Sequence, residues 1–281
     1  MRNPRPICPN ALCENHTKPP ADFYKKNGYY RPRHNHQPVP RYKCKACGKQ
    51  FSATQAKTIR NQHRPDLNRE IFLMAVSGTS MRRMSELMGC SRTTVIRKVA
   101  YLAKEARKHH ARHLGQMQTG YVMFDELATF VHARWKQLSV AMAIRAKTGE
   151  VIAFGVARTA SKMPEGIAFN RWVVDERPIV VPKVLGQIRP VLKPGAVVVS
   201  DQEAQYGKWM AQALPGVKHN PKKAVKGPVY DPHFAINQAF AKIRLDLARL
   251  GRRTWTTTKS IRALENHLWL WVAWTNGYPL R

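Results

Sequence analysis

Apolar positions repeat with different periods in successive parts of the chain. From residue 67 to 113 they recur every three or four positions, which predicts amphipathic helices. From about residue 119 they form short runs rich in β-branched and aromatic residues, which predicts strands that alternate with helices. Residues 14–43 are rich in Pro, Lys, Arg and His and hold too little apolar material to form a core. We therefore expect three modules, 1–58, 59–118 and 119–281.

The helical region is divided by serine and glycine where helices begin and end. Ser80 and Ser91 are predicted N-caps of the second and third helices, and Gly89 makes the turn between them. The spacing of Ser85, Gly89 and Val95 is typical of a helix-turn-helix, whose last helix meets DNA base edges. The side chains that we expect to contact DNA from this helix are Arg92, Thr93, Arg97 and Lys98. An ordinary three-helix bundle with a solvated basic face is the alternative.

The last module alternates strands and helices. The predicted strands are 121–124, 130–135, 138–145, 151–157, 196–200 and 217–219. The predicted helices are about 169–192, 206–214, 233–250 and 260–275. A meander of antiparallel strands followed by alternating helix and strand is the order of a ribonuclease-H-like fold. The predicted fold class is α/β, with a mixed sheet and covering helices.

Two of the predicted strands end in an aspartate. Asp125 follows the run YVMF, and Asp201 follows AVVVS, which suits a strand buried on both faces. A carboxylate at the end of a rigid strand can present a metal ligand, although it more often caps the next helix. Glu126 follows Asp125 directly and should point to the opposite face, and Glu203 comes shortly after Asp201; we expect surface or capping roles for both glutamates.

The helix predicted at 233–250 carries polar residues on the flank of its apolar stripe. His233 and Asn237 lie one turn apart there, and Arg244 follows two turns later. Asn237 is a candidate third metal ligand because an amide oxygen binds hard cations, but it brings no negative charge. Glu265 on the last helix is the other candidate, and an ion pair with a nearby arginine is its alternative role.

Charge narrows the class of partner. The chain has 48 Lys and Arg against 17 Asp and Glu, a formal net charge of +31. Such a charge attracts phosphate backbones through counterion release. An RNA-associated or membrane-surface protein is the alternative, but the longest apolar run, LWLWVAW, is too short to cross a bilayer. We expect a soluble, cytoplasmic, nucleoid-associated protein with no membrane contact.

Four of the five cysteines form two closely spaced pairs near the amino terminus. These are Cys8 with Cys13 and Cys44 with Cys47. Two such turns can bring four thiolates around Zn²⁺, and the metal would stabilise a segment without a core. Disulfides are unfavourable in a cytosolic chain. A histidine could replace one thiolate, the candidates being His16, His34 and His36. Cys90 is expected to be a small buried apolar residue.

The motifs and their order resemble the insertion-sequence transposases of the zinc-ribbon, Asp-Asp-Glu type, the IS-one and related group. The resemblance covers nearly the whole chain. It rests on CPNALC and RYKCKACGKQFS, the helix-turn-helix, DELATFV, VVVSDQEAQY and NQAFAKIRLDLARLGRRTWTTTKS. In the last segment Asn237 occupies the position of the family's third acidic residue, normally a glutamate. Each motif is moderately specific, but five in the same order are not expected by chance.

The resemblance implies a transposase that binds the ends of its insertion sequence, cleaves DNA and joins it to target DNA. Asp125, Asp201 and Asn237 would hold two Mg²⁺ or Mn²⁺ ions for this phosphoryl transfer. The family's DNA-positioning cations would correspond to Arg244, Arg252 and Arg253. Double-stranded DNA and further copies of the chain, in a dimer or larger oligomer on DNA, are the implied partners. Two alternatives remain: a domesticated transposase that regulates by binding DNA, and an RNA-binding zinc-ribbon protein.

Overall fold

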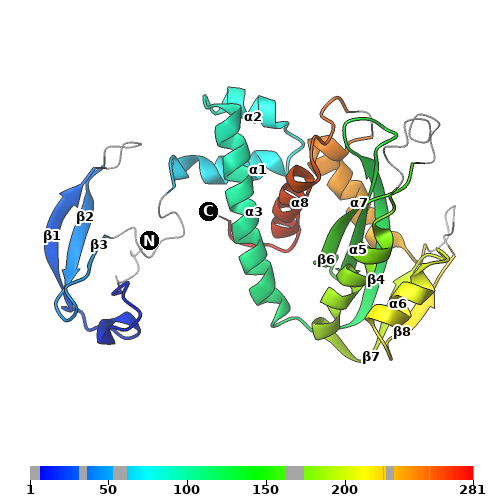
Figure 1. Cartoon of the computed structure of the whole chain (residues 1–281), viewed down its shortest axis with the longest axis horizontal. Coiled ribbons are helices and arrows are strands. Elements are labelled where there is room, and N and C mark those ends of the chain that lie inside the picture. Colours follow the sequence, from blue (N-terminus) through cyan, green and yellow to red (C-terminus); the bar gives the residue numbers. More distant parts are fainter. Residues whose placement is uncertain are drawn as a thin grey trace. The chain divides into compact units, whose positions relative to one another are not determined.

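The computed structural model describes residues 7–31, 37–52, 62–161, 174–223, 225, 231–252 and 254–280. The chain divides into two compact units, Met1–Asp66 and Leu67–Arg281 (Figure 1). Among the helices in these ranges, none combines the length and the apolar character needed to cross a membrane. His34, His36 and Arg253 lie outside the described residues.

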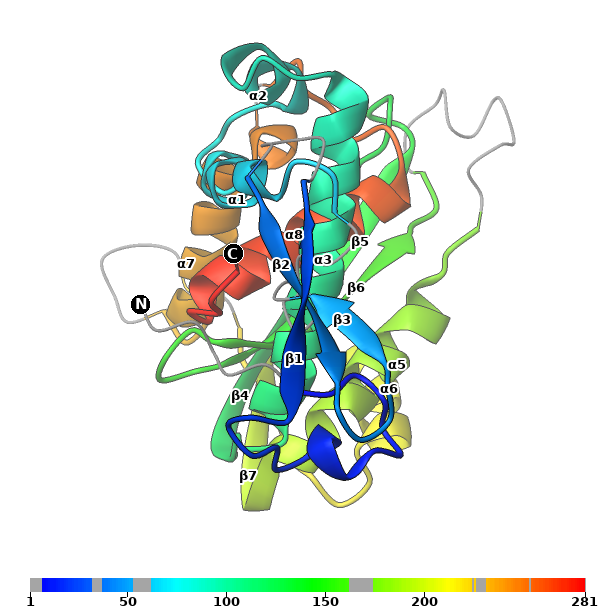
Figure 2. The same cartoon turned by 90° about the vertical axis from the view of Figure 1, so that its left-hand side faces the viewer.

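The amino-terminal unit is a small antiparallel sheet beside a short 3-10 helix, η1 (Glu14–His16). Its strands are β1 (Tyr24–Tyr30), β2 (Val39–Cys44) and β3 (Gln50–Ser52), in that order across the sheet (blue in Figure 2). Phe23 and Phe51 stack with their ring centroids 5.8 Å apart and pack with three buried cysteines. So small a core gives limited stabilisation, which agrees with the expectation that this unit needs another support.

The three predicted helices are present: α1 (Asn68–Ala75), α2 (Met81–Leu87) and α3 (Arg92–Leu114). A 3-10 turn, η2 (Pro65–Leu67), precedes them. The Ser80 hydroxyl accepts a hydrogen bond from the Arg83 amide at 3.2 Å, and Ser91 accepts one from the Thr94 amide at 3.1 Å. Gly89 adopts φ +55° between α2 and α3, a left-handed conformation that glycine tolerates without strain.

These helices share one hydrophobic core with the sheet that follows them. Core positions of α3 such as Val99 and Leu102 belong to the same buried cluster as Met142 of the sheet and Leu268 of helix α8 (Ile261–Thr275). His110 of α3 also contacts the carbonyl of Ile152 at 2.8 Å. Residues 67–118 are thus part of the compact unit Leu67–Arg281 and do not form a separate body.

A mixed five-stranded sheet forms the centre of this larger unit. Its strands are β4 (Thr119–Phe130), β5 (Gln137–Arg145), β6 (Val151–Arg158), β7 (Leu192–Ser200) and β8 (Lys218–Pro221), in the order β6-β5-β4-β7-β8. β5 is antiparallel to β4 and to β6, whereas β7 is parallel to β4 and to β8. The predicted α/β class with a mixed sheet is confirmed.

The first strand of the sheet was predicted wrongly in one respect. β4 does not end at Asp125 but continues to Phe130, and the predicted strand at 130–135 does not exist. Val131 and Lys136 instead close a turn through a 3.0 Å backbone hydrogen bond, and β5 begins at Gln137. β5 pairs with β4 along residues 122–130, and these cross-strand contacts keep the polar residues at 125–126 extended.

Helices cover both faces of the sheet (Figure 1). Helices α5 (Arg177–Ile188) and α6 (Tyr206–Ala213) pack with Phe124 and its neighbours, and α7 (Phe234–Asp246) and α8 pack with Met123 and Leu127. Short 3-10 turns follow α5 and α7, namely η3 (Arg189–Val191) and η4 (Ala248–Leu250). The apolar stripe predicted on α7 is buried, with Ile236 and Ile243 fully inaccessible. A Cβ at Gly155 would lie 2.7 Å from Val184, so glycine lets α5 approach β6 closely.

Candidate functional site

The four cysteines of the amino-terminal unit meet at one point, as predicted. Their sulfur atoms all lie within 4.8 Å of one another. Cys8 Sγ is 3.5 Å from Cys47 Sγ, and Cys13 Sγ is 3.8 Å from Cys44 Sγ. A zinc–sulfur bond of about 2.3 Å corresponds to a sulfur–sulfur separation of about 3.8 Å in a regular tetrahedron. This cluster could therefore hold a metal ion such as zinc.

The backbone around the second cysteine pair favours thiolates, whereas burial raises the pKa of Cys8. Burial raises the pKa of Cys44, but hydrogen bonds from the amides of Cys47 and Ala46 and from the Asn15 side chain lower it to about 6. Gly48, at φ +70°, donates its amide to the Cys44 carbonyl at 3.1 Å and closes the turn. His16 lies beside this set but contacts the Cys8 carbonyl at 2.7 Å through Nδ1.

Cys90 differs from its prediction, because it is half-buried at the edge of the main core and not fully enclosed.

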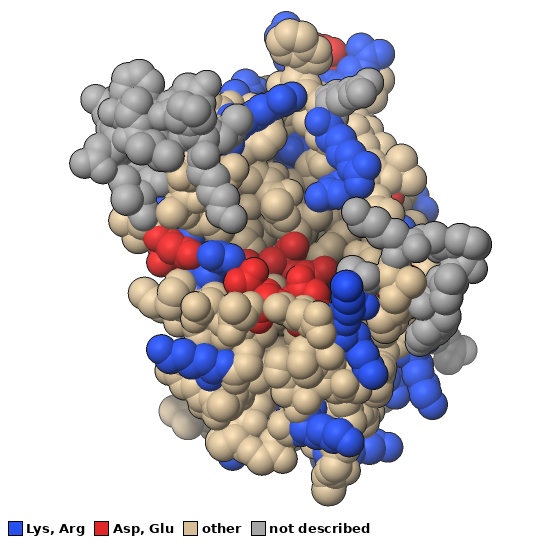
Figure 3. Space-filling model, turned by 90° about the vertical axis from the view of Figure 1, so that its right-hand side faces the viewer, with Lys and Arg blue, Asp and Glu red and all other residues tan. Residues whose placement is uncertain are grey.

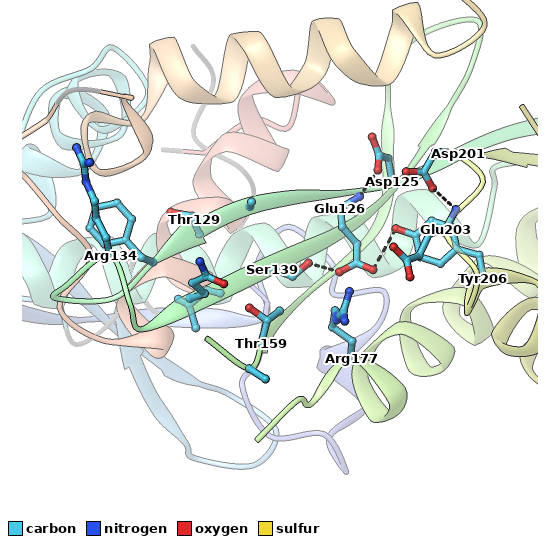
Figure 4. Close-up of a pocket in the computed structure, with 15 residues that line it drawn as sticks. Asp125, Glu126, Thr129, Arg134, Ser139, Thr159, Arg177, Asp201, Glu203 and Tyr206 are labelled. Atoms are coloured by element: carbon cyan, nitrogen blue, oxygen red, sulfur yellow. Dashed lines mark hydrogen bonds between the residues drawn. The ribbon is translucent and has the colours of Figure 1, made fainter. Parts of the chain in front are cut away.

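In the larger unit, β4 and β7 bring Asp125 and Asp201 to the same level of the sheet. The parallel register pairs Met123 with Val199, and each aspartate follows its strand partner by two residues. Side chains two positions apart share a face of a strand, so the two carboxylates are neighbours. Figure 4 shows them side by side at the adjoining ends of the paired stretch.

Both aspartates line a pocket of about 490 Å³ that holds two further carboxylates, Glu126 and Glu203. Four of the chain's 17 acidic residues therefore converge here in a protein of net charge +31. Figure 3 shows the acidic side chains gathered in a hollow of this face, with lysine and arginine around it. Such clustering is electrostatically unfavourable unless cations compensate it.

Asp125 is affected both by its burial and by the neighbouring negative charge. Burial raises the pKa of its carboxyl to about 6, the Glu126 amide opposes the rise by donating to Oδ1 at 2.6 Å, and the charge of Asp201 adds to it. A divalent cation between the two carboxylates would remove the repulsion, and carboxylate oxygens are ligands that Mg²⁺ and Mn²⁺ prefer. The donor set therefore fits such an ion.

Glu126 points to the opposite face from Asp125, as expected, but it has no surface or capping role. The Ser139 hydroxyl donates a short hydrogen bond to Oε2, and the Tyr206 hydroxyl donates to Oε1 at 3.0 Å (Figure 4). Burial raises its pKa, while these two hydrogen bonds and the charge of Arg177 lower it. Glu126 is thus a built part of the pocket, fixed between β5 and α6.

Two arginines, Arg134 and Arg177, line the same pocket. Asp175 orients the guanidinium of Arg177, because its carboxylate accepts a hydrogen bond from Arg177 Nη2 at 2.7 Å. An oriented cation beside a carboxylate cluster can bind a phosphate that the carboxylates alone would repel. No local motif marks either arginine, so their place in the pocket does not follow from the sequence.

The predicted third ligand, Asn237, lies on the first turn of α7 and is exposed. Its side-chain nitrogen donates to Asp231 Oδ2 at 2.9 Å, and Asp231 also accepts the His233 amide at 2.9 Å. These hydrogen bonds hold the pKa of Asp231 below its usual value. An ionised carboxylate, which the sequence analysis missed, therefore lies directly beside Asn237.

His233 connects this group with the aspartate pair. It is 3% exposed, and in its protonated form it would lower the pKa of both Asp125 and Asp231. Its Nε2 contacts the Lys222 carbonyl at 3.0 Å, so in the neutral ring Nε2 carries the proton and Nδ1 has the lone pair. Within the described residues no hydrogen-bond partner is present for the buried Nδ1. Neither His233 nor Asn237 lines the pocket around Asp125.

The predicted DNA contacts of α3 divide into two groups. Arg92, Thr93 and Arg97 are exposed at the start of the helix, as the prediction requires. Lys98 is only 5% exposed, so its assignment as a DNA contact is wrong. A spacing of three or four residues places Lys98 on the same inward stripe as Val95 and Leu102.

Arg244 is half-buried on α7, and Arg252 is exposed in the segment after η4. Burial lowers the pKa of Arg244, and the charge of Arg252 lowers it further, which places the two cations close together. Glu265 is half-buried on α8 and does not line the pocket of Asp125 and Asp201. No described ion pair joins Glu265 to an arginine.

Compared with protein-family models and with curated proteins, the chain matches none.

Proposed function

We propose that the chain is a DNA transposase that uses divalent cations to cleave DNA at the ends of its element and to join them to a target. The observation that carries the proposal is the pair formed by Asp125 in β4 and Asp201 directly after β7. The parallel register of these two strands brings both carboxylates to one level, in an acidic pocket of a strongly basic protein. The sheet order β6-β5-β4-β7-β8, with β5 antiparallel to its neighbours, supports a ribonuclease-H-like domain.

In this proposal Asp125 and Asp201 hold Mg²⁺ or Mn²⁺ through their carboxylate oxygens. The bound cations would activate a water or hydroxyl nucleophile and stabilise the leaving oxygen. Arg177 and Arg134 position the phosphate, and Glu126, fixed by Ser139 and Tyr206, keeps the pocket negative on its other side.

Asn237 completes the site together with its neighbours. Its amide oxygen is a neutral ligand for a hard cation, and Asp231 beside it supplies the negative charge that position 237 lacks. The free Nδ1 lone pair of His233 is a further donor near Asp125, with its other nitrogen held on a carbonyl as in many metal-ligating histidines.

The remaining parts of the chain serve DNA binding. The four-cysteine cluster holds a structural Zn²⁺, and α3 presents Arg92, Thr93 and Arg97 to the major groove of the element's ends. The chain acts on two ends as a dimer or larger oligomer. One observation favours a second candidate: Asn237 is exposed and bonded to Asp231, away from the pocket, as in a DNA-binding regulator that has lost catalysis.

Incubation of the purified chain with supercoiled plasmid and Mg²⁺ or Mn²⁺ separates the two candidates. The transposase converts the plasmid to nicked circles only when a divalent cation is present. The regulator binds DNA in a mobility-shift assay but leaves the plasmid intact at every cation concentration.

A further inference from the structure

A second groove lies at the junction of the helix-turn-helix with the segment before α8. It has a volume of about 450 Å³ and is bounded by the starts of α2 and α3, by residues 248–249 and 255–260, and by Ala263 and His267 of α8. Four cations line it: Arg82, Arg92, Arg249 and Lys259. No aspartate or glutamate is among the described residues that line it, so its preference is for an anion.

The cation at the base of this groove is rigidly held. Arg249 Nε donates to His267 Nδ1 at 2.9 Å, so Nδ1 has no proton and Nε2 donates to the Ala75 carbonyl at 2.6 Å. Burial lowers the pKa of Arg249 to about 10, which leaves it charged at neutral pH. The guanidinium is thus held by His267 of α8, which is itself held by α1, and it needs little further ordering to bind a phosphate.

An aromatic side chain stands at the rim of the groove. Trp255 lines it and is 99% exposed, although Trp is a residue that proteins usually cover. The turn that carries it is well defined: Thr254 Oγ1 accepts the Thr256 amide at 3.0 Å, and the Thr256 hydroxyl donates to the Ala248 carbonyl at 2.7 Å. The indole is therefore displayed by an ordered turn.

We propose that this groove binds one unpaired nucleotide of the DNA substrate, with its base stacked on Trp255 and its phosphate on Arg249 and Lys259. A flat indole face beside fixed cations matches a base and the phosphate next to it. Bases inside a duplex have both faces covered by their neighbours, so Trp255 can stack only on a base that is extruded or lies at an open end. The inference rests on the proposed function, because it takes DNA as the substrate.

The groove would also connect the recognition of the DNA ends by α3 with the pocket of Asp125 and Asp201. Arg92 lies both at the start of the expected recognition helix and on the wall of the groove. The groove and α3 belong to the same compact unit as the sheet. A DNA strand that is bound by α3 would therefore pass Trp255 at a fixed distance from Asp125 and Asp201. This fixed distance would determine which nucleotide is presented for cleavage.

The test compares two DNA probes with the same duplex: one is closed at both ends by non-nucleotide linkers, so that no base is unpaired, and the other has an open end with a short single-stranded overhang. Fluorescence anisotropy gives the dissociation constant of each probe for the full zinc-loaded chain. Trp255→Ala should weaken overhang binding by about 5- to 150-fold, the range for loss of one stacked base, and leave binding of the closed duplex within about twofold. Trp255→Tyr, which keeps an aromatic face, should restore most of the affinity.

The control is Trp274→Ala, because Trp274 is 51% exposed on α8 and does not line the groove. Lys259→Gln should reduce the slope of log affinity against log salt by about one, as expected for one phosphate contact. Equal affinities of wild type and Trp255→Ala for the overhang probe would overturn the proposal, and so would an equal loss for both probes. If Trp255 binds a protein partner and not DNA, wild type and Trp255→Ala should have equal affinities for the overhang probe.

The plasmid-nicking assay keeps this result separate from the proposed function. If the chain prefers the overhang through Trp255 but nicks no plasmid, nucleotide binding in the groove is supported and the transposase activity is refuted. If the chain nicks plasmid and Trp255→Ala binds both probes as tightly as wild type does, the transposase activity is supported and nucleotide binding in the groove is refuted.

Discussion

Asp125 in β4 and Asp201, directly after β7, lie at the same level of the sheet, although 75 residues separate them in the chain. The strand register sets their proximity, so a rigid part of the protein holds the pair. The raised pKa of Asp125, about 6, arises from burial and from the charge of Asp201. This pair is the basis of the proposed metal site.

Removal of the four-cysteine site should unfold the amino-terminal unit and spare the rest. Cys44→Ser should eliminate the one zinc ion that we expect per chain, because a three-thiolate site binds far more weakly. Elemental analysis measures the zinc, and circular dichroism melting follows the Leu67–Arg281 unit, whose transition should not move. Cys90→Ser is the matched control and should keep the zinc; zinc retained in Cys44→Ser would refute the assigned ligand set.

Asn237→Asp should make the third position depend on metal. The substitution places two carboxylates where the Asn237 amide now donates to Asp231 at 2.9 Å, so the metal-free chain should lose about 1–2 kcal/mol of unfolding free energy. Mn²⁺ should restore this loss and raise the melting temperature more than it does in wild type. If Mn²⁺ leaves the variant as unstable as before, position 237 is not a ligand.

Arg92→Ala and Arg97→Ala should each reduce binding to the element's ends by about 1–3 kcal/mol if the lost contact is a bidentate contact to a base. Binding to unrelated duplexes should change much less, which mobility-shift titrations with both DNAs would measure. Lys98→Ala should instead reduce thermal stability, because Lys98 is 5% exposed in the helix core. Unchanged preference in both arginine variants would exclude α3 as the recognition helix.

Acid should destabilise the larger unit through His267. Burial and the charge of Arg249 lower the pKa of His267 to about 3, whereas its unfolded value is near 6.5. A depressed pKa means that the unfolded state takes up the proton first. The associated stability is therefore complete above pH 6.5 and declines by about 1.4 kcal/mol per pH unit as the pH falls toward 3.

Urea titrations between pH 7 and pH 5 measure this slope. His267→Gln can accept from Arg249 and donate to Ala75 without titrating, so its slope should be shallower than that of wild type. His63→Gln, at an exposed position, should retain the wild-type slope. An identical pH dependence in wild type and His267→Gln would show that His267 is not the responsible group.

Local patterns were sufficient to predict most elements of the fold. The caps at Ser80 and Ser91 and the turn at Gly89 are decided by neighbouring residues, and they lie where the sequence placed them. The four-cysteine cluster follows from spacing and ligand chemistry in the same way. The burial of Lys98 also follows from a local pattern, because its spacing from Val95 and Leu102 places it on the inward face of α3.

The parts that the sequence did not predict depend on distant pairing. β4 continues through Asp125 and Glu126 because β5 pairs with it there, and no local sequence pattern predicts this pairing. Glu126 acquires its role from Tyr206 of α6, 80 positions away. Asp231 lies in a segment rich in proline and lysine whose pattern predicts a loop, so its hydrogen bond with Asn237 appears only in three dimensions.

The rate at which the chain nicks supercoiled plasmid in Mn²⁺ tests the central claim most directly. Wild type and Glu150→Gln, a charge-matched control in the turn between β5 and β6, should nick at equal rates. Asp125→Asn and Asp201→Asn should each be slower by roughly a thousandfold, because a metal ligand worth several kcal/mol is lost. Nicking that persists in both variants, or is absent from folded wild-type protein that binds DNA, would contradict the account.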